Sequence, residues 1–162
     1  MTKNKAAFFD IDGTFYRDSL LIEHFKRLIK YEIISPSVWH EQVKHTFEDW
    51  DKRQGNYDDY LLDVSKIYVE HLTNVSKEDI EFIAKQVIRI KADRVYKYTR
   101  QQIGWHLEND YKVIFISGSP DFLVSKMAEK YNATDFCGST YHIDDAGFFT
   151  GKVQPMWDSV NK

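Results

Sequence analysis

Two aspartates separated by one residue follow directly after a short apolar run near the start of the chain. The run AAFF fills residues 6–9, and the string DIDGT follows it from Asp10 to Thr14. A short apolar run that ends at a turn predicts a buried β-strand. In open parallel α/β sheets, ligands bind beyond the carboxyl ends of the strands. The sequence therefore predicts a binding edge that carries Asp10 and Asp12.

A second segment repeats this pattern about a hundred residues later. The apolar run VIFI fills residues 113–116 and is followed by Ser117, Gly118, Ser119 and Pro120. Two strands that are apolar on both faces are typical of a parallel sheet with helices covering each side. A third strand is predicted over residues 134–143, with a hairpin arm after it over 148–153.

Between the first two strands, the sequence has helical periodicity and no convincing strand. Ser35 with Pro36 predicts a helix start, and Ser76 with Asp79 predicts another. Aromatic residues on these helices are expected to form the core of a helical bundle. The sequence therefore predicts an α/β protein with a helical insertion.

Composition excludes several classes of function. The net charge of −3 gives no basic surface for nucleic acid. Cys137 is the single cysteine, so neither an internal disulfide nor a thiolate metal cluster is expected. His40 and His45 are five residues apart, a poor spacing for a zinc site on a helix. The chain shows no signal peptide and no span for a membrane, and a cytoplasmic location is expected.

The paired aspartates have the chemistry for phosphoryl transfer. One carboxylate can attack phosphorus, while the second protonates the leaving oxygen and later activates water. Gly13 lets the backbone approach a phosphate, and Thr14 offers a hydroxyl and an amide. The alternative is a capped turn, since Asp-Gly is common in loops.

The string from Phe8 to Thr14 closely resembles the first signature of the haloacid dehalogenase superfamily. This resemblance implies that Asp10 is the nucleophile and Asp12 the general acid/base. It also implies that Asp10 and the backbone carbonyl of Asp12 bind Mg²⁺. A Rossmann-like core is implied over residues 1–16 and 99–162, with an α-helical cap over 17–98 that closes over the site.

Later segments resemble further signatures of the superfamily. Ser117 stands at the place of its small hydroxyl residue, and the Ser117 hydroxyl with the amides of Gly118 and Ser119 is expected to hold phosphate oxygens. The alternative role for Ser117 is a helix N-cap. Residues 147–153 resemble the hairpin of the phosphoserine-phosphatase-like branch, which makes Lys162 the catalytic and phosphate-binding lysine. Lys152 is the competing candidate.

The fourth signature, an acidic pair that completes the Mg²⁺ site, is not found before the last residue, Lys162. We therefore expect a core that is incomplete at its C-terminus and a chain with weak or no turnover. The missing segment would also flank the first strand, so self-association through that open strand edge is expected.

Substrate residues of phosphoserine phosphatases do not carry over. Where that branch has a glutamate, this chain has residues 16–19, YRDS, and Val64 stands in place of its arginine. Arg17 and Asp18 could contact a substrate or begin a helix. The resemblance implies a Mg²⁺-dependent hydrolase, and a small phosphomonoester is the expected substrate. The alternatives are a phosphotransferase with the same site and a catalytically silent phosphate-binding remnant, and a dehalogenase is less expected.

Overall fold

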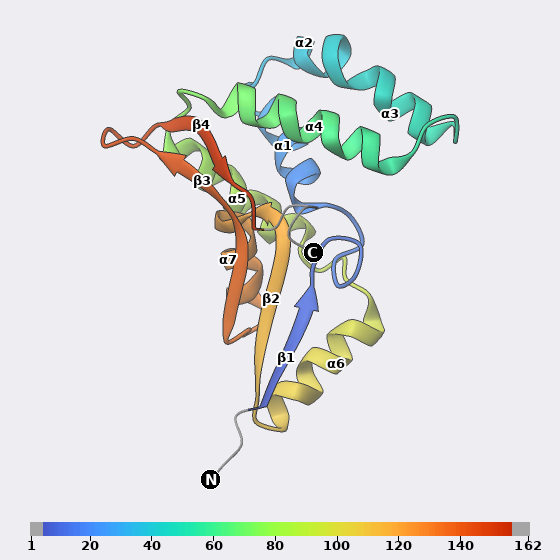
Figure 1. The fold of residues 1–162 in the computed structure, drawn as a ribbon, viewed down its shortest axis with the longest axis vertical. Helices are drawn as coiled ribbons and strands as arrows, with labels where there is room; N and C mark the ends of the chain where they lie inside the picture. The colour runs from blue at the N-terminus through green and yellow to red at the C-terminus, as the bar shows by residue number, and fades with distance from the viewer. Residues whose placement is uncertain (1–4, 157–162) are drawn as a thin grey trace. The chain divides into compact units, whose positions relative to one another are not determined.

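The computed structural model describes residues 5–156 and contains a sheet with strand order β1-β2-β3-β4 (Figure 1). The strands are β1 (Lys5–Asp10), β2 (Tyr111–Pro120), β3 (Asp135–Ile143) and β4 (Phe149–Gln154). The helices are α1 (Leu20–Lys30), α2 (Pro36–Val38), the π-helical η1 (Trp39–Val43), α3 (Lys44–Asp51), α4 (Tyr57–Leu72), α5 (Lys77–Lys91), α6 (Lys97–Glu108) and α7 (Asp121–Lys130). Because β1, β2 and β3 pair in parallel, the predicted α/β class with a parallel core is confirmed.

The chain divides into two compact units. The core unit comprises Met1–Leu20, Ala84–Thr140 and Gln154–Lys162, and the helical unit comprises Leu21–Ile83 and Tyr141–Val153. The sequence-based limits of core and cap, residues 1–16 and 99–162 against 17–98, stay a prediction. Across residues 5–156, none of the helices has both the length and the apolar character that a bilayer crossing needs.

Parallel pairing of β1 and β2 builds one face of the core unit. Their register sets Phe9 opposite Phe115, and Val113 shares that face because side chains alternate along a strand. Phe115 and Val113 are fully buried, and α6 and α7 both contact β2. The core cluster contains Ile11, Phe15, Tyr16, Leu20, Ala84, Ile88, Ala92, Ile103, Val113, Phe115, Leu123, Val124, Met127 and Ala128.

The other face of β1 differs from the prediction that helices cover both sides. Phe8 pairs with Ile114 on this face and is 63% exposed in the part of the chain that the structure describes. β1 also lies at the end of the strand order, so its outer edge is unpaired within residues 5–156. Self-association through this edge stays a prediction.

The helix start predicted at Ser35 and Pro36 is confirmed by local contacts in the helical unit. The Ser35 hydroxyl accepts from the amide of Ser37, and Pro36 is the first residue of α2. The helix predicted from Pro36 through Trp50 continues, but it includes a π-helical segment, Trp39–Val43.

The next two helices in the sequence also start at capped residues. Asn56 caps α4 by accepting from the amide of Asp59 at 2.8 Å. The predicted pair at the start of α5 forms too, since Ser76 accepts from the amide of Asp79 and donates to its carboxylate. These two starts therefore follow from short-range hydrogen bonds.

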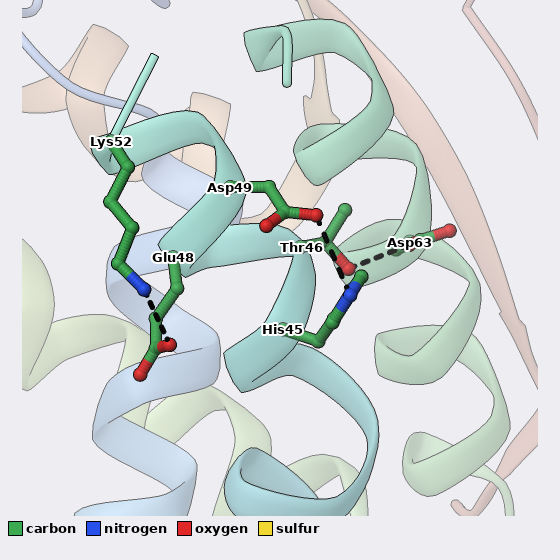
Figure 2. Close-up of polar contacts among 6 residues, drawn as sticks. All are labelled: His45, Thr46, Glu48, Asp49, Lys52 and Asp63. Carbon is green, nitrogen blue, oxygen red and sulfur yellow. Dashed lines mark hydrogen bonds and ion pairs between the residues drawn. The ribbon is translucent and has the colours of Figure 1, made fainter. Parts of the chain in front are cut away.

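Helices α3 and α4 lie side by side and are joined by polar and aromatic contacts. The Thr46 hydroxyl donates to Asp63 of α4 at 2.8 Å, as Figure 2 shows. Trp50 of α3 stacks on Tyr60 of α4 with ring centroids 5.4 Å apart. Figure 2 also shows two exposed pairs: His45 with Asp49 within α3, and Glu48 of α3 with Lys52, which directly follows the helix. Since Tyr60 is 1% exposed, this pairing belongs to the core of the helical unit.

A buried histidine lies at the centre of the helical unit. His24 is fully buried and bonds to the carbonyl of Ile80 through Nε2 and to the Tyr68 hydroxyl through Nδ1. A carbonyl only accepts, so Nε2 carries the proton and Tyr68 donates to Nδ1. Burial lowers the pKa of His24 from 6.5 to about 4, although the bond to Ile80 opposes the shift. His24 is therefore neutral at neutral pH.

We predict that His24 makes the helical unit sensitive to acid. In the unfolded chain its imidazole takes a proton near pH 6.5, whereas the folded chain holds it neutral down to about pH 4. Between these values the unfolded state binds more protons, so the free energy of unfolding decreases as the pH falls. The expected loss is about 3 kcal/mol or less over this window.

Urea unfolding between pH 4 and 7 measures this dependence. The matched variant His24→Gln lacks the titrating group and should show a flatter profile. Equal pH profiles for the two proteins would contradict the assignment.

Candidate active site

A tight loop after β1 fixes the position of the paired aspartates. The carbonyl of Ile11 accepts from the amides of Thr14, Phe15 and Tyr16 at 3.2, 3.0 and 2.8 Å. Ile11, Phe15 and Tyr16 are fully buried in the core unit. Gly13 has a φ of +79°, a backbone conformation that glycine adopts without strain. The loop is therefore held by its own backbone and by buried side chains at both ends.

Asp12 is the acceptor at the centre of the site. Its Oδ2 accepts from the hydroxyls of Ser117 at 2.5 Å and Ser119 at 2.8 Å, and its Oδ1 accepts from the amide of Leu20 at 2.6 Å. The two serines come from the end of β2, and Leu20 is the first residue of α1. Both carboxylate oxygens thus have donors within the core unit.

The surroundings of Asp12 and Asp10 differ. Burial raises the pKa of Asp12, the three hydrogen bonds lower it, and the nearby charge of Asp10 raises it, with a net upward shift. Asp10 ends β1 and is exposed. The loop therefore presents one accessible carboxylate beside one that is shielded and held.

The turn that carries the two serines is braced by β3. The Ser139 hydroxyl donates to the carbonyl of Gly118 at 2.8 Å, and the amide of Ser119 donates to the Ser117 hydroxyl at 3.0 Å. Gly138 packs directly against this turn, because a Cβ there would lie 2.7 Å from the Cα of Asp121. The close approach requires glycine at this place in β3.

The predicted phosphate-binding residues differ in their surroundings and in the groups that they leave available. Ser117 is next to Asp12, and its hydroxyl proton is used on that carboxylate. Thr14 was predicted to offer phosphate both its amide and its hydroxyl. The amide donates to the Ile11 carbonyl, so the exposed side chain is the group still available for phosphate. Gly118 is exposed, while Lys152 is exposed on β4. Lys162 lies outside the described residues.

Two members of the site were not predicted in their present roles. The Ser119 hydroxyl and the Leu20 amide both hold Asp12, whereas the sequence suggested only an amide role for Ser119. The sequence could have indicated a second hydroxyl at the site, because serines flank Gly118 on both sides. The Leu20 amide carries no signal in the sequence, since every residue except proline has one.

Arg17 and Asp18, which follow the loop, are occupied with Arg94. The Asp18 carboxylate forms an ion pair with the Arg94 guanidinium at 3.1 Å, and the Arg17 amide donates to the Arg94 carbonyl at 3.0 Å. Both contacts join the segment before α1 to the segment after α5, within the core unit. Either residue's contact with a substrate stays a prediction.

The oxygen donors at the loop fit a hard cation. Asp10 offers an exposed carboxylate and Asp12 a backbone carbonyl, both of the type that Mg²⁺ prefers. Within residues 5–156, no cluster of three or more His, Cys, Asp or Glu side chains is placed to hold a metal ion. The loop thus offers two oxygen ligands of the kind that a partly hydrated Mg²⁺ accepts.

Comparison with known sequences identifies a family. Residues 7–162 match the family model described as haloacid dehalogenase-like hydrolase. No curated protein shows a significant sequence match to the chain.

Comparison with solved structures identifies the same fold in longer proteins. A protein of unknown function from Bordetella pertussis Tohama I has a TM-score of 0.74 at 13% identity, covering 96% of this chain and 69% of that one. A phospho-aspartyl intermediate analogue of phosphoserine phosphatase has a TM-score of 0.55 at 22% identity, covering 95% and 64%. A substrate-bound phosphoserine phosphatase has a TM-score of 0.57 at 21% identity, covering 96% and 64%. The chain spans about two thirds of the length of these relatives.

We predict that Asp12→Asn stabilises the protein near neutral pH. The folded-state pKa of Asp12 is raised, so its contribution to stability is present at low pH and lost as the pH rises through that pKa. Asparagine removes the charge and still offers an oxygen to the Leu20 amide. We expect the melting temperature at pH 7.5 to rise by a few degrees, since about 1 kcal/mol corresponds to roughly 2–4 °C at this size.

Thermal unfolding at pH 7.5 and pH 5, without added metal, measures this effect. The gain should shrink at the lower pH, and Asp18→Asn, at an exposed ion pair, should change little. A lower melting temperature for Asp12→Asn at pH 7.5 would contradict the prediction.

A second prediction concerns the close contact of Gly138 with the backbone at Ser119 and Asp121. Gly138→Ala places a methyl group 2.7 Å from the Cα of Asp121 and 3.0 Å from its amide nitrogen, so we expect destabilisation by about 1–3 kcal/mol. Gly104→Ala is the matched control, because a Cβ there meets nothing within 4 Å and alanine favours its helix by about 0.5–1 kcal/mol. Urea unfolding compares the two variants, and equal stabilities would show that the close approach is not required.

Proposed function

The chain belongs to the haloacid dehalogenase-like hydrolase family, whose model matches residues 7–162, and we propose that it hydrolyses a small phosphomonoester with Asp10 as nucleophile. The observation that carries this proposal is the contrast between the two aspartates. Asp10 is exposed at the end of β1, whereas both carboxylate oxygens of Asp12 are held by donors. The two carboxylates are therefore suited to different roles.

Asp10 is proposed to form the covalent bond. Its carboxylate oxygen attacks phosphorus, the ester P–O bond breaks, and an aspartyl-phosphate forms. Asp12 donates a proton to the leaving oxygen, which departs as an alcohol. The raised pKa of Asp12 favours the protonated form that this step requires.

The second step returns both aspartates to their starting states. Asp12, now ionised, takes a proton from a water molecule as that water attacks the phosphorus of the aspartyl-phosphate. The P–O bond to Asp10 breaks and inorganic phosphate leaves. A phospho-aspartyl analogue of a structurally similar phosphoserine phosphatase supports this route.

Charge on the phosphoryl oxygens is proposed to be neutralised at the same edge. The Asp10 carboxylate and the Asp12 backbone carbonyl would hold Mg²⁺, which when bound supplies positive charge beside the phosphoryl group. The Ser117 hydroxyl and the Gly118 amide would bind phosphoryl oxygens, whereas the Ser119 amide already donates to the Ser117 hydroxyl. Lys162 is proposed as the cationic side chain that neutralises nucleophile and phosphate.

The natural substrate is proposed to be a small phosphorylated metabolite. Phosphoserine phosphatases share the fold, which alone does not carry their substrate to this chain. Asp18 is engaged by Arg94, near the point where the sequence departs from that branch. A panel of phosphorylated metabolites tests the choice, and a strong preference for phosphoserine would favour that substrate.

We predict that Asp10→Asn abolishes turnover of para-nitrophenyl phosphate in the presence of Mg²⁺. Removal of a covalent nucleophile should reduce kcat at least about a thousandfold. The matched control Asp93→Asn removes a carboxylate from the exposed pair with Lys130 and should retain activity. Steady-state kinetics and binding of inorganic phosphate are measured for both variants. If the unchanged chain turns over the ester and Asp10→Asn does so at the same rate, this nucleophile is excluded.

A further inference from the structure

Ser117 has one hydroxyl proton and two acceptors that require it. In the structure that proton is donated to Asp12 Oδ2 at 2.5 Å, while the Ser117 oxygen accepts from the Ser119 amide at 3.0 Å. The proposed function also needs Ser117 to donate to a phosphoryl oxygen. A serine hydroxyl donates one hydrogen bond at a time. When Ser117 donates to phosphate, Asp12 must therefore lose the hydrogen bond that Ser117 gives it.

Ser119 supplies the donor that remains on Asp12. Its hydroxyl donates to the same Oδ2 at 2.8 Å, and the Leu20 amide donates to Oδ1 at 2.6 Å. After Ser117 turns away, each oxygen of the Asp12 carboxylate still has one donor. Without Ser119, Oδ2 would lose both of its hydroxyl donors, which is costly for a shielded carboxylate.

The surroundings keep Ser119 in place during this exchange. Ser119 is 4% exposed and is followed by the buried Pro120, whose ring fixes the backbone. Its carbonyl lies 3.0 Å from where a Cβ of Gly138 would be, and the preceding carbonyl of Gly118 accepts from Ser139. Ser119 is therefore better suited to stay on Asp12 than to follow the phosphate.

We propose that Ser119 is a positioning residue, which holds Asp12 while Ser117 transfers its hydrogen bond from Asp12 to the phosphoryl group. This inference rests on the proposed function, because it takes Ser117 as the phosphate donor and Asp12 as the acid/base. It adds a division of labour between two serines of one turn. Ser117 exchanges partners, and Ser119 does not touch the phosphate.

Binding of inorganic phosphate tests the exchange without turnover. Calorimetry in the presence of Mg²⁺ compares the unchanged chain with Ser117→Ala, Ser119→Ala and the double variant. Ser119→Ala should weaken phosphate binding by roughly threefold to tenfold, the value of about one hydrogen bond, although Ser119 does not touch the ligand. In the Ser117→Ala background the same change should have no effect on phosphate affinity, since Asp12 then loses no hydrogen bond when phosphate binds.

Ser125→Ala is the matched control. This serine lies on α7, where its hydroxyl donates to the carbonyl of Phe122, and its loss should leave phosphate affinity unchanged. Ser119→Thr keeps the hydroxyl and should restore the affinity lost in Ser119→Ala. The melting temperature of each variant verifies that it is folded at the temperature of measurement.

Kinetics give a second readout that a purely structural role would not move. Acid catalysis by Asp12 is worth more for an alkyl leaving group than for para-nitrophenol, and general acid catalysis contributes about 10²–10⁴-fold. Ser119→Ala should therefore lower kcat/KM for an alkyl phosphate by about tenfold more than for para-nitrophenyl phosphate. Ser125→Ala should lower neither.

The outcomes separate the two proposals. If the unchanged chain does not bind phosphate, or if Asp10→Asn keeps full turnover, the proposed function fails and the role of Ser119 fails with it. If phosphate binds and Asp10→Asn is inactive, but Ser119→Ala matches Ser125→Ala in affinity and kinetics, only the role of Ser119 is overturned. An equal effect of Ser119→Ala with and without Ser117 would also overturn it.

Discussion

The hydrogen bonds to Asp12 are the interaction on which the candidate site depends. They join the loop after β1 to the end of β2, between residues more than a hundred positions apart in the chain. A shielded carboxylate without donors would be costly, so the two segments stabilise each other when they meet. Gly138 and Ser139 extend this support to β3, because the serine turn rests on their backbone and hydroxyl. Three parallel strands thus contribute to one small region of the core unit.

This support explains how two neighbouring aspartates come to differ. Asp10 is at the end of a strand and stays exposed, whereas Asp12 enters the loop and turns toward the serines. Burial raises the pKa of Asp12 while the donors lower it, and burial is the larger effect. A nucleophile needs access, and an acid needs a proton held in place. Two aspartates separated by one residue therefore have one exposed and one shielded environment.

The helical unit solves a comparable problem with neutral groups. His24, Tyr68 and the Ile80 carbonyl satisfy one another in a fully buried position, and none of them carries a charge at neutral pH. Aromatic contacts such as that of Trp50 with Tyr60 fill the space between α3 and α4. The unit is thus held by its own contacts, which are separate from the hydrogen bonds to Asp12.

The sequence by itself determined the strands, the helix starts at Pro36 and after Ser76, and the identity of Asp10, Asp12 and Ser117 as neighbours at one sheet edge. These follow from short-range patterns: apolar runs, caps such as Ser76 with Asp79, and strand ends that meet in parallel sheets. Only the tertiary structure decided that Ser117 donates to Asp12, that Ser119 and the Leu20 amide join it, and that Phe8 is exposed. These contacts depend on which way individual hydroxyl groups donate and on which segments pack together. Local sequence periodicity encodes neither.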